Sequence, residues 1–433
     1  MKKLLAVLIS LAMLACVLPA AMADEEPIHI KFWHTRGSGA NYEVVQHSVN
    51  TFNETIGKEK GIVVEEVYSG SYNDILPATQ LAIQSGESPQ VVVSGNTFVN
   101  YLLEDGVLAD MAPLAKSTGW DTANLLQPFQ EIKGNTDGTL YSLPYVRSTP
   151  LFYYNKTMAD AKGLTAPTTV DEMVEFCRAL WQKDGENTSV YGLCILNDFG
   201  YIQAANLYQL GSAYLNKEGT ACPALDDGTM LKVLGDWRSW IDEGWCSPYD
   251  ATNAGAVATE MFAQQKLACL VYSSGGLSTM SKNAKDNGFE LGVAQYPTYD
   301  ADKRIAEIGG GNICIIAEGN TDEQIAASWE FVQYLMSDEM VTYNTTMTGY
   351  VPTTRSVAEY EGMKKFWEEN PLFKVAYDQV TTGRCQENPY SEYLQDFTQC
   401  CWDAVSLLIQ DQSITAEEAV EHIRTNSAQF FNK

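Results

Sequence analysis

A serine and glycine turn, SSGGL at 273–277, separates an apolar run from a helical pattern. Free backbone N–H groups at the start of a helix can hold a phosphate or a sugar hydroxyl. Ser273 or Ser274 could equally cap the helix with no ligand present. No Walker lysine follows these glycines and the sequence has no G-x-G-x-x-G motif, so nucleotide binding is not indicated. The turn predicts either a polar ligand site or a simple cap.

Aromatic side chains are a second group that could hold a solute. Trp33, Tyr72, Trp245 and Tyr350 could stack on a sugar ring, because their flat apolar faces suit C–H groups while their polar tips find partners. For Trp33 and Trp245 we favour packing in the core, where large aromatic residues are usually found.

Residues that bind metals do not gather in the sequence. The four histidines are scattered, and the ten cysteines show no zinc spacing. Nine cysteines remain outside the leader described below, an odd number, and several lie in apolar runs where a thiol behaves as a small hydrophobe. We therefore expect no metal or cofactor and mostly reduced, buried cysteines, with one or two disulfides left open.

These residues must be positioned by alternating strands and helices. Segment 28–34 alternates like a strand, and residues 42–52 carry apolar side chains at helical spacing. The same alternation continues through 61–69, 72–86 and 89–95. Such a pattern predicts an α/β fold with mainly parallel strands, whose ligands gather beyond the carboxyl ends of the strands.

Later segments predict more helices within one continuous fold. Residues 168–183 begin with a threonine cap and have one apolar face, and residues from about 391 to 431 have a helical pattern throughout. At 433 residues, without a low-complexity linker, the chain is long enough for two lobes joined by short connections.

The N-terminus has the order of a secretory signal peptide: two lysines, an apolar stretch and small residues before Asp24. We expect cleavage after residue 23, with lipidation at Cys16 as the alternative. Loss of Lys2 and Lys3 changes the formal net charge from −27 to −29. So acidic a protein is not expected to bind nucleic acid. No second run approaches the length of a membrane span, so we expect an exported protein in the periplasm or on the outer face of the cytoplasmic membrane.

The segment DGTLYSLPYVRSTPLFYYNKTM at 137–158 places a polar, proline-bracketed stretch before an aromatic strand. It resembles the crossover between the lobes of extracellular solute-binding proteins of ABC importers, in the maltodextrin and glycerol-3-phosphate branch. An ordinary surface turn is the alternative interpretation. KFWH, GSYNDIL, YSSGGL, GGGNICI, GYVPTTRS and GRCQENPYSEY agree in order along the mature chain. The glycerol-3-phosphate type is the most similar.

This resemblance implies a two-lobed, type II periplasmic-binding-protein-like fold with the ligand cleft between the lobes, which close by a hinge motion. The first lobe would contain residues 24–145 and 297–349, and the second residues 146–296 and 350–433. It implies ligand contacts from Tyr72, Asn96, Ser148, Ser274, Gly310 or Gly311, Tyr350 and Arg384. The family has a glutamate where this chain has Asn96, and this difference bears on which ligand is bound.

Arg384 would be the chemically decisive contact, because a guanidinium holds phosphate in a forked, charge-assisted geometry. Arg147 is a second cation near the same cleft. The resemblance implies a monomeric binding protein without catalytic activity, which delivers glycerol 3-phosphate or a glycerophosphodiester to ABC permease subunits. A receptor for a neutral sugar or oligosaccharide is the alternative, as is a sensory module.

A secreted glycoside hydrolase is the alternative from another class of protein. It would need two carboxylates roughly 5–10 Å apart on either side of the bond. The segments that we expect in the cleft are dominated by serine, glycine, tyrosine and arginine, which does not favour this interpretation.

Overall fold

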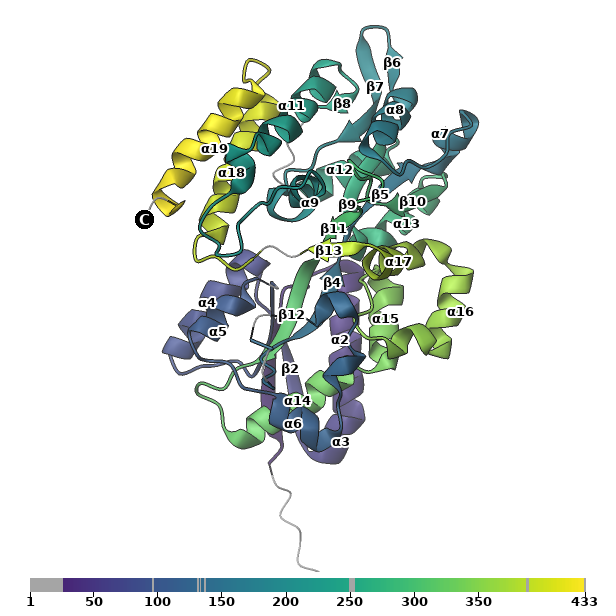
Figure 1. The fold of residues 1–433 in the computed structure, drawn as a ribbon. Coiled ribbons are helices and arrows are strands. Elements are labelled where there is room, and N and C mark those ends of the chain that lie inside the picture. The colour runs from purple at the N-terminus through teal and green to yellow at the C-terminus, as the bar shows by residue number, and fades with distance from the viewer. Residues whose placement is uncertain are drawn as a thin grey trace, which may run out of the picture.

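The computed structural model of the protein describes residues 26–95, 97–130, 132, 134–135, 138–248, 254–386 and 389–431. Within these ranges the chain forms two lobes, each built on its own sheet, which lie one above the other (Figure 1). The predicted signal peptide and Cys16 lie outside the described residues. The two-lobed α/β arrangement agrees with the expected fold class.

The first sheet has the strand order β2-β1-β3-β12-β4. β1 pairs in parallel with β2 and β3, whereas β12 runs antiparallel to β3 and β4. Since β4 is antiparallel to β12, it runs in the same direction as β1, β2 and β3, and β12 is the one strand of this described sheet that runs the other way. The strands of this sheet are thus mainly parallel in direction, as expected, with β12 inserted against them. The strands are β1 Ile28–His34, β2 Ile62–Tyr68, β3 Val91–Gly95, β4 Leu143–Ser148 and β12 Gly309–Ile315.

Helices cover both faces of this sheet and bury a core rich in aromatic residues. The ring of Phe331 on α14 lies edge-on to Phe32 on β1 and to Phe52 on α2, with centroids 5.2 and 5.1 Å apart. The helices of this lobe are α2 Gly39–Glu54, α3 Ile56–Lys60, α4 Tyr72–Gln84, α5 Val99–Glu104, α6 Ala112–Thr118 and α14 Asp322–Leu335.

The second sheet has the order β10-β5-β9-β7-β6, and β8 pairs with β7. Its strands are β5 Pro150–Asn155, β6 Gln182–Asp184, β7 Asn187–Cys194, β8 Cys246–Ser247, β9 Leu267–Ser273 and β10 Leu291–Gln295. Its helices are α7 Lys156–Ala161, α8 Val170–Leu180, α9 Ala204–Gln209, α10 Pro223–Asp226, α11 Thr229–Asp242, α12 Ala254–Ala263, α13 Leu277–Asp286, α18 Leu394–Gln410 and α19 Ala416–Phe431.

Two predicted helices differ from the structure at their ends. α8 begins as expected with a capping box, in which Thr169 Oγ1 accepts from the Glu172 N–H at 3.2 Å. It stops at Leu180 because the next residues pair with β7 as strand β6. The C-terminal segment is two helices and not one, because residues 411–415 form a turn that lets α19 pack back on α18.

Short elements connect the two lobes at one side. α15 Asp338–Thr348, α16 Glu361–Glu369 and α17 Val375–Thr382 lie beside the junction, and strands β11 Ile305–Glu307 and β13 Arg384–Gln386 pair with each other there (Figure 1). The remaining short helices are η1 Thr122–Asn124, η2 Gln127–Phe129, η3 Phe199–Gln203, η4 Ser274–Gly276, η5 Ser356–Glu359 and η6 Pro371–Lys374. The residue boundaries of the lobes stay a prediction.

The nine cysteines from Cys177 to Cys401 are free thiols, and all but Cys385 are buried. No helix in the described part of the chain is long and apolar enough to cross a membrane.

Candidate functional site

The chain passes from the first sheet to the second through a single residue, Thr149, between β4 and β5. Thr149 is fully buried. Its N–H donates to Ser274 Oγ at 3.3 Å, and its hydroxyl donates to the Glu307 carbonyl oxygen at 3.0 Å. Gln379 Nε2 donates to the same hydroxyl at 2.7 Å. The polar stretch is thus a buried crossover, and its interpretation as an ordinary surface turn is wrong.

A cavity of about 590 Å³ lies beside this crossover, a volume typical of sites for small ligands. Its walls come from turns that follow strands of both sheets and from α18. Its lining residues are Tyr72, Asn73, Gly95, Thr97, Phe98, Ser148, Asp198, Gly200, Tyr201, Ser273, Glu307, Ile308, Gly309, Gly310, Tyr350, Leu394, Gln395, Asp396, Thr398, Gln399 and Trp402.

Four of the residues expected to contact the ligand line this cavity together: Tyr72, Ser148, Gly310 and Tyr350. Gly310 is required there by its backbone, which has φ +96°, and by space, because a Cβ atom would lie 2.0 Å from the Val146 carbonyl oxygen. The glycine therefore lets β12 pass close to β4 at the cavity wall.

The other expected contacts lie elsewhere. Asn96 is outside the described residues, although Gly95 and Thr97 on either side of it line the cavity. Ser274 is fully buried and accepts the Thr149 hydrogen bond, while its neighbour Ser273 lines the cavity and caps η4.

Two further expected contacts are not among the residues that line the cavity. Gly311 follows Gly310 on β12, where a Cβ atom would lie 2.9 Å from the Tyr72 hydroxyl. Arg384 has an exposed side chain on β13. Whether Arg384 reaches the ligand stays a prediction.

Three carboxylates line the cavity: Asp198, Glu307 and Asp396. The segments that we expected in the cleft did not include Asp198, which directly precedes η3, or Asp396, which lies on α18. The Asp198 carboxylate accepts no hydrogen bond and joins no ion pair within the described residues, and burial raises its pKa to about 6. Glu307 lies two residues before the first of the glycines 309–311, so its nearness to them was a signal that the sequence did contain.

Aromatic residues missed in the sequence also line the cavity. The Tyr201 hydroxyl donates to Ser148 Oγ at 2.9 Å, which joins the second lobe to the end of β4. Trp402 lies on the partly exposed side of α18. Trp245, by contrast, is buried in the second lobe's core, as we favoured, and Trp33 packs against an apolar cluster of the first lobe.

No lysine or arginine lines the cavity in the described ranges. Arg147 is fully buried behind the wall, where its Nη1 donates to Asn312 Oδ1 at 2.8 Å. Burial lowers the pKa of Arg147 to about 10, so the guanidinium keeps its charge at neutral pH. The cavity thus has acidic and aromatic walls, with positive charge only in a deeper layer.

Comparisons with known proteins agree with the resemblance found in the sequence. A model of the bacterial extracellular solute-binding proteins matches residues 48–375. The sn-glycerol-3-phosphate-binding periplasmic protein of Rhizobium meliloti is 27% identical over 370 residues, which cover 81% of each chain. The protein of the same name from Yersinia pestis is 26% identical over 378 residues, covering 83% of this chain and 81% of the other.

Solved structures share the fold. The crystal structure of UgpB from Mycobacterium tuberculosis in complex with glycerophosphocholine has a TM-score of 0.80 at 21% identity, covering 93% of this chain and 98% of that one. Maltose-bound MalE3 of T. maritima has a TM-score of 0.75 at 19% identity, covering 92% and 98%. Because the family model matches most of the chain, the protein belongs to the bacterial extracellular solute-binding proteins, which capture solutes for ABC importers and are not enzymes.

Proposed function

We propose that the protein captures a glycerophosphodiester with a cationic head group, of which glycerophosphocholine is the simplest example, and delivers it to its ABC permease. The solute would lie in the cavity between the lobes, against Tyr72, Ser148, Gly310 and Tyr350. The relatives named for sn-glycerol 3-phosphate and the structural neighbour that holds glycerophosphocholine support a glycerophosphate ligand.

The charge of the cavity wall is the observation that carries this proposal. Asp198, Glu307 and Asp396 line the cavity, and no lysine or arginine does so in the part of the chain that the structure describes. Free glycerol 3-phosphate is close to a dianion at neutral pH, so carboxylates would repel it. A phosphodiester has less negative charge, and a quaternary ammonium group suits carboxylates and the faces of Tyr201 and Trp402.

A neutral oligosaccharide is the second candidate, favoured by the combination of carboxylates and aromatic rings. Carboxylates accept hydrogen bonds from sugar hydroxyls, and rings such as those of Phe98 and Trp402 offer flat faces to C–H groups. The maltose-bound structural neighbour shares the fold and is compatible with this alternative.

Titration calorimetry on residues 24–433 with glycerophosphocholine, glycerol 3-phosphate and maltotriose tests the proposal. We expect glycerophosphocholine to bind at least about tenfold more tightly than glycerol 3-phosphate. Asp198→Asn should weaken the binding of glycerophosphocholine, and Arg384→Ala tests whether that exposed arginine also reaches the phosphate. Binding of maltotriose alone would overturn the proposal in favour of the oligosaccharide.

A further inference from the structure

Arg36 is a buried cation without an acidic partner. Its residue is only 4% exposed, and it forms no ion pair within the described residues. Its Nε and Nη2 donate to Asn41 Oδ1 at 3.3 and 3.0 Å, and Nη2 also donates to Asn344 Oδ1 at 2.8 Å. Within the described part of the chain, Nη1 is buried and has no hydrogen-bond partner. The guanidinium is therefore surrounded by neutral side chains, among them these two amides.

Such an arrangement is unfavourable for folding alone. A buried charge loses its hydration, and neutral amides compensate for only part of that loss. Arg238 in the second lobe is buried to a similar degree, but its Nη2 lies 2.7 Å from the Asp242 carboxylate. Glu66, on the strand beside Arg36, is engaged by His34 and Tyr42, at 2.8 and 2.7 Å. A negative group that arrives with the ligand would complete the surroundings of Arg36.

Arg36 lies at the edge of the sheet where the cavity is. It follows β1, which is flanked in the sheet by β2 and β3, and the turns after those two strands supply Tyr72 and Thr97 to the cavity wall. The Arg36 guanidinium carbon lies 5.3 Å from the ring centroid of Tyr350, another wall residue. Burial raises the pKa of Tyr72, and the charge of Arg36 is among the effects that oppose this shift. One layer of tyrosine side chains thus separates the guanidinium from the cavity.

We propose that Arg36 is the positioning residue for the ligand's phosphate: its charge holds the anionic group of the solute against Tyr72 and Tyr350. This inference rests on the proposed function, because a neutral sugar would not need the cation. It also explains how a cavity with acidic walls accepts a zwitterion. The phosphate would lie at the Arg36 end, and the cationic head would lie toward Asp198 and Asp396. The hydroxyls of the two tyrosines would donate to the phosphate oxygens with Arg36 behind them.

Two variants test Arg36 by calorimetry with glycerophosphocholine on residues 24–433. Arg36→Gln removes the charge, and we expect a loss of affinity of about tenfold or more. Asn344→Asp places a carboxylate beside Nη2 at nearly the same volume, so it should neutralise Arg36 and also weaken binding about tenfold. The matched control is Arg178→Gln, which removes an arginine from the outer surface of the second lobe and should leave the affinity unchanged.

The Asn344→Asp variant separates this role from a purely structural one. If Arg36 only anchors α2 to α15, a carboxylate at residue 344 strengthens that anchor, so the melting temperature rises and affinity is kept or improved. Under our proposal the melting temperature rises while affinity falls. Unchanged affinity in Asn344→Asp would therefore overturn the role of Arg36 and leave the proposed function intact, whether or not Arg36→Gln folds. If the unmodified protein does not bind glycerophosphocholine, the proposed function fails, and this inference fails with it.

Discussion

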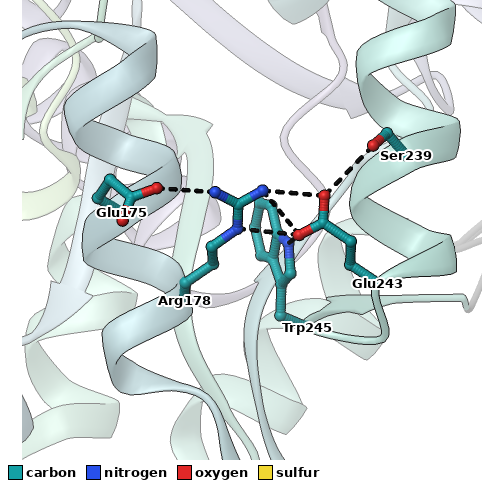
Figure 2. A network of polar contacts seen from close by, with 5 residues as sticks. All are labelled: Glu175, Arg178, Ser239, Glu243 and Trp245. Carbon is teal, nitrogen blue, oxygen red and sulfur yellow. Dashed lines mark hydrogen bonds and ion pairs between the residues drawn. The ribbon is translucent and has the colours of Figure 1, made fainter.

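Arg178 and Arg36 show two different ways of placing an arginine. Arg178 on α8 is at the surface and is surrounded by acids: its Nε and Nη2 donate to the Glu243 carboxylate at 2.9 Å each, and its Nη1 donates to Glu175 at 2.7 Å (Figure 2). Trp245 and Ser239 also donate to Glu243. Arg36 is buried beside the cavity, and its side chain donates hydrogen bonds to the neutral amides of Asn41 and Asn344. Of these two arginines, the one with charged partners joins two helices of the second lobe, and the one with neutral partners lies near the cavity.

The pKa values of the carboxylates differ in the same way. For Glu243, burial favours the neutral acid, but hydrogen bonds from Arg178 and Trp245 outweigh it and lower the pKa. For Asp198 on the cavity wall, nothing opposes burial, and its pKa rises to about 6. Burial of the Asp198 carboxylate lowers the stability of the ligand-free protein. A ligand with a positive group could offset this loss by pairing with the carboxylate. The predictions below test this difference, beginning with the largest effect.

Asp198→Asn should stabilise the ligand-free protein at neutral pH. A raised pKa means that the fold favours the protonated acid, so the cost of Asp198 is absent at pH values below its ordinary pKa of 3.8. The cost appears as the pH rises toward about 6 and is complete above that value. The free energy of unfolding of the variant should exceed that of the unmodified protein by about 1 to 3 kcal/mol at pH 7.5.

Urea unfolding of both proteins at pH 3.5 and pH 7.5 measures this difference. The two measurements at pH 3.5 are the internal control, because the variant and the unmodified protein should be equally stable there. If the variant and the unmodified protein were equally stable at pH 7.5 as well as at pH 3.5, Asp198 would be solvated as an ordinary surface carboxylate. Stability that falls on substitution at pH 7.5 would mean that the carboxylate has a partner in the fold.

The comparison also shows how far the sequence predicted the site. Tyr72, Ser148, Gly310 and Tyr350 were predicted because the short motifs that contain them resemble the contact motifs of the solute-binding family. Asp198, Tyr201, Asp396 and Trp402 were not predicted, because only the docking of η3 and α18 against the first lobe decides which of their side chains face the cavity. The apolar stripe of α18 was visible in the sequence, but most of the α18 residues that line the cavity lie beside that stripe.

The arginines illustrate the same limit. Arg384 was chosen because of its motif and its chemistry, and the structure gives it an exposed side chain on β13. Arg36 was not chosen, since a lone arginine after a strand has no local signal. Its burial depends on α15, more than 300 positions later, which supplies Asn344. Contacts of such long range are set by tertiary packing and not by local pattern.

Tyr101→Phe should loosen the contact between the lobes by a smaller amount. The Tyr101 hydroxyl on α5 donates to the Ser391 carbonyl oxygen of the second lobe at 2.7 Å, and its ring lies edge-on to Tyr390 at 5.3 Å. Losing one such hydrogen bond costs about 1 kcal/mol. If this contact holds the cavity closed, release of glycerophosphocholine should become about fivefold faster.

Stopped-flow measurement of ligand release tests this contact, with Tyr68→Phe as the control because Tyr68 is an exposed tyrosine of the first lobe. An unchanged release rate in Tyr101→Phe would mean that the two lobes do not separate along this edge.

Arg178→Gln should have the smallest effect, although Arg178 makes more ionic contacts than Arg36 does. Its side chain is 38% exposed, so water and salt screen its attraction to Glu175 and Glu243. We expect a loss of stability of less than about 1 kcal/mol in urea unfolding, smaller still at high salt, with no change in ligand affinity. Arg178→Lys, which keeps the charge but not the fork, should lie between the two proteins. A loss above about 2 kcal/mol would mean that this surface network is a main support of the packing between α8 and α11. In that case the two arginines would differ in where they lie and not in how strongly their contacts stabilise the protein.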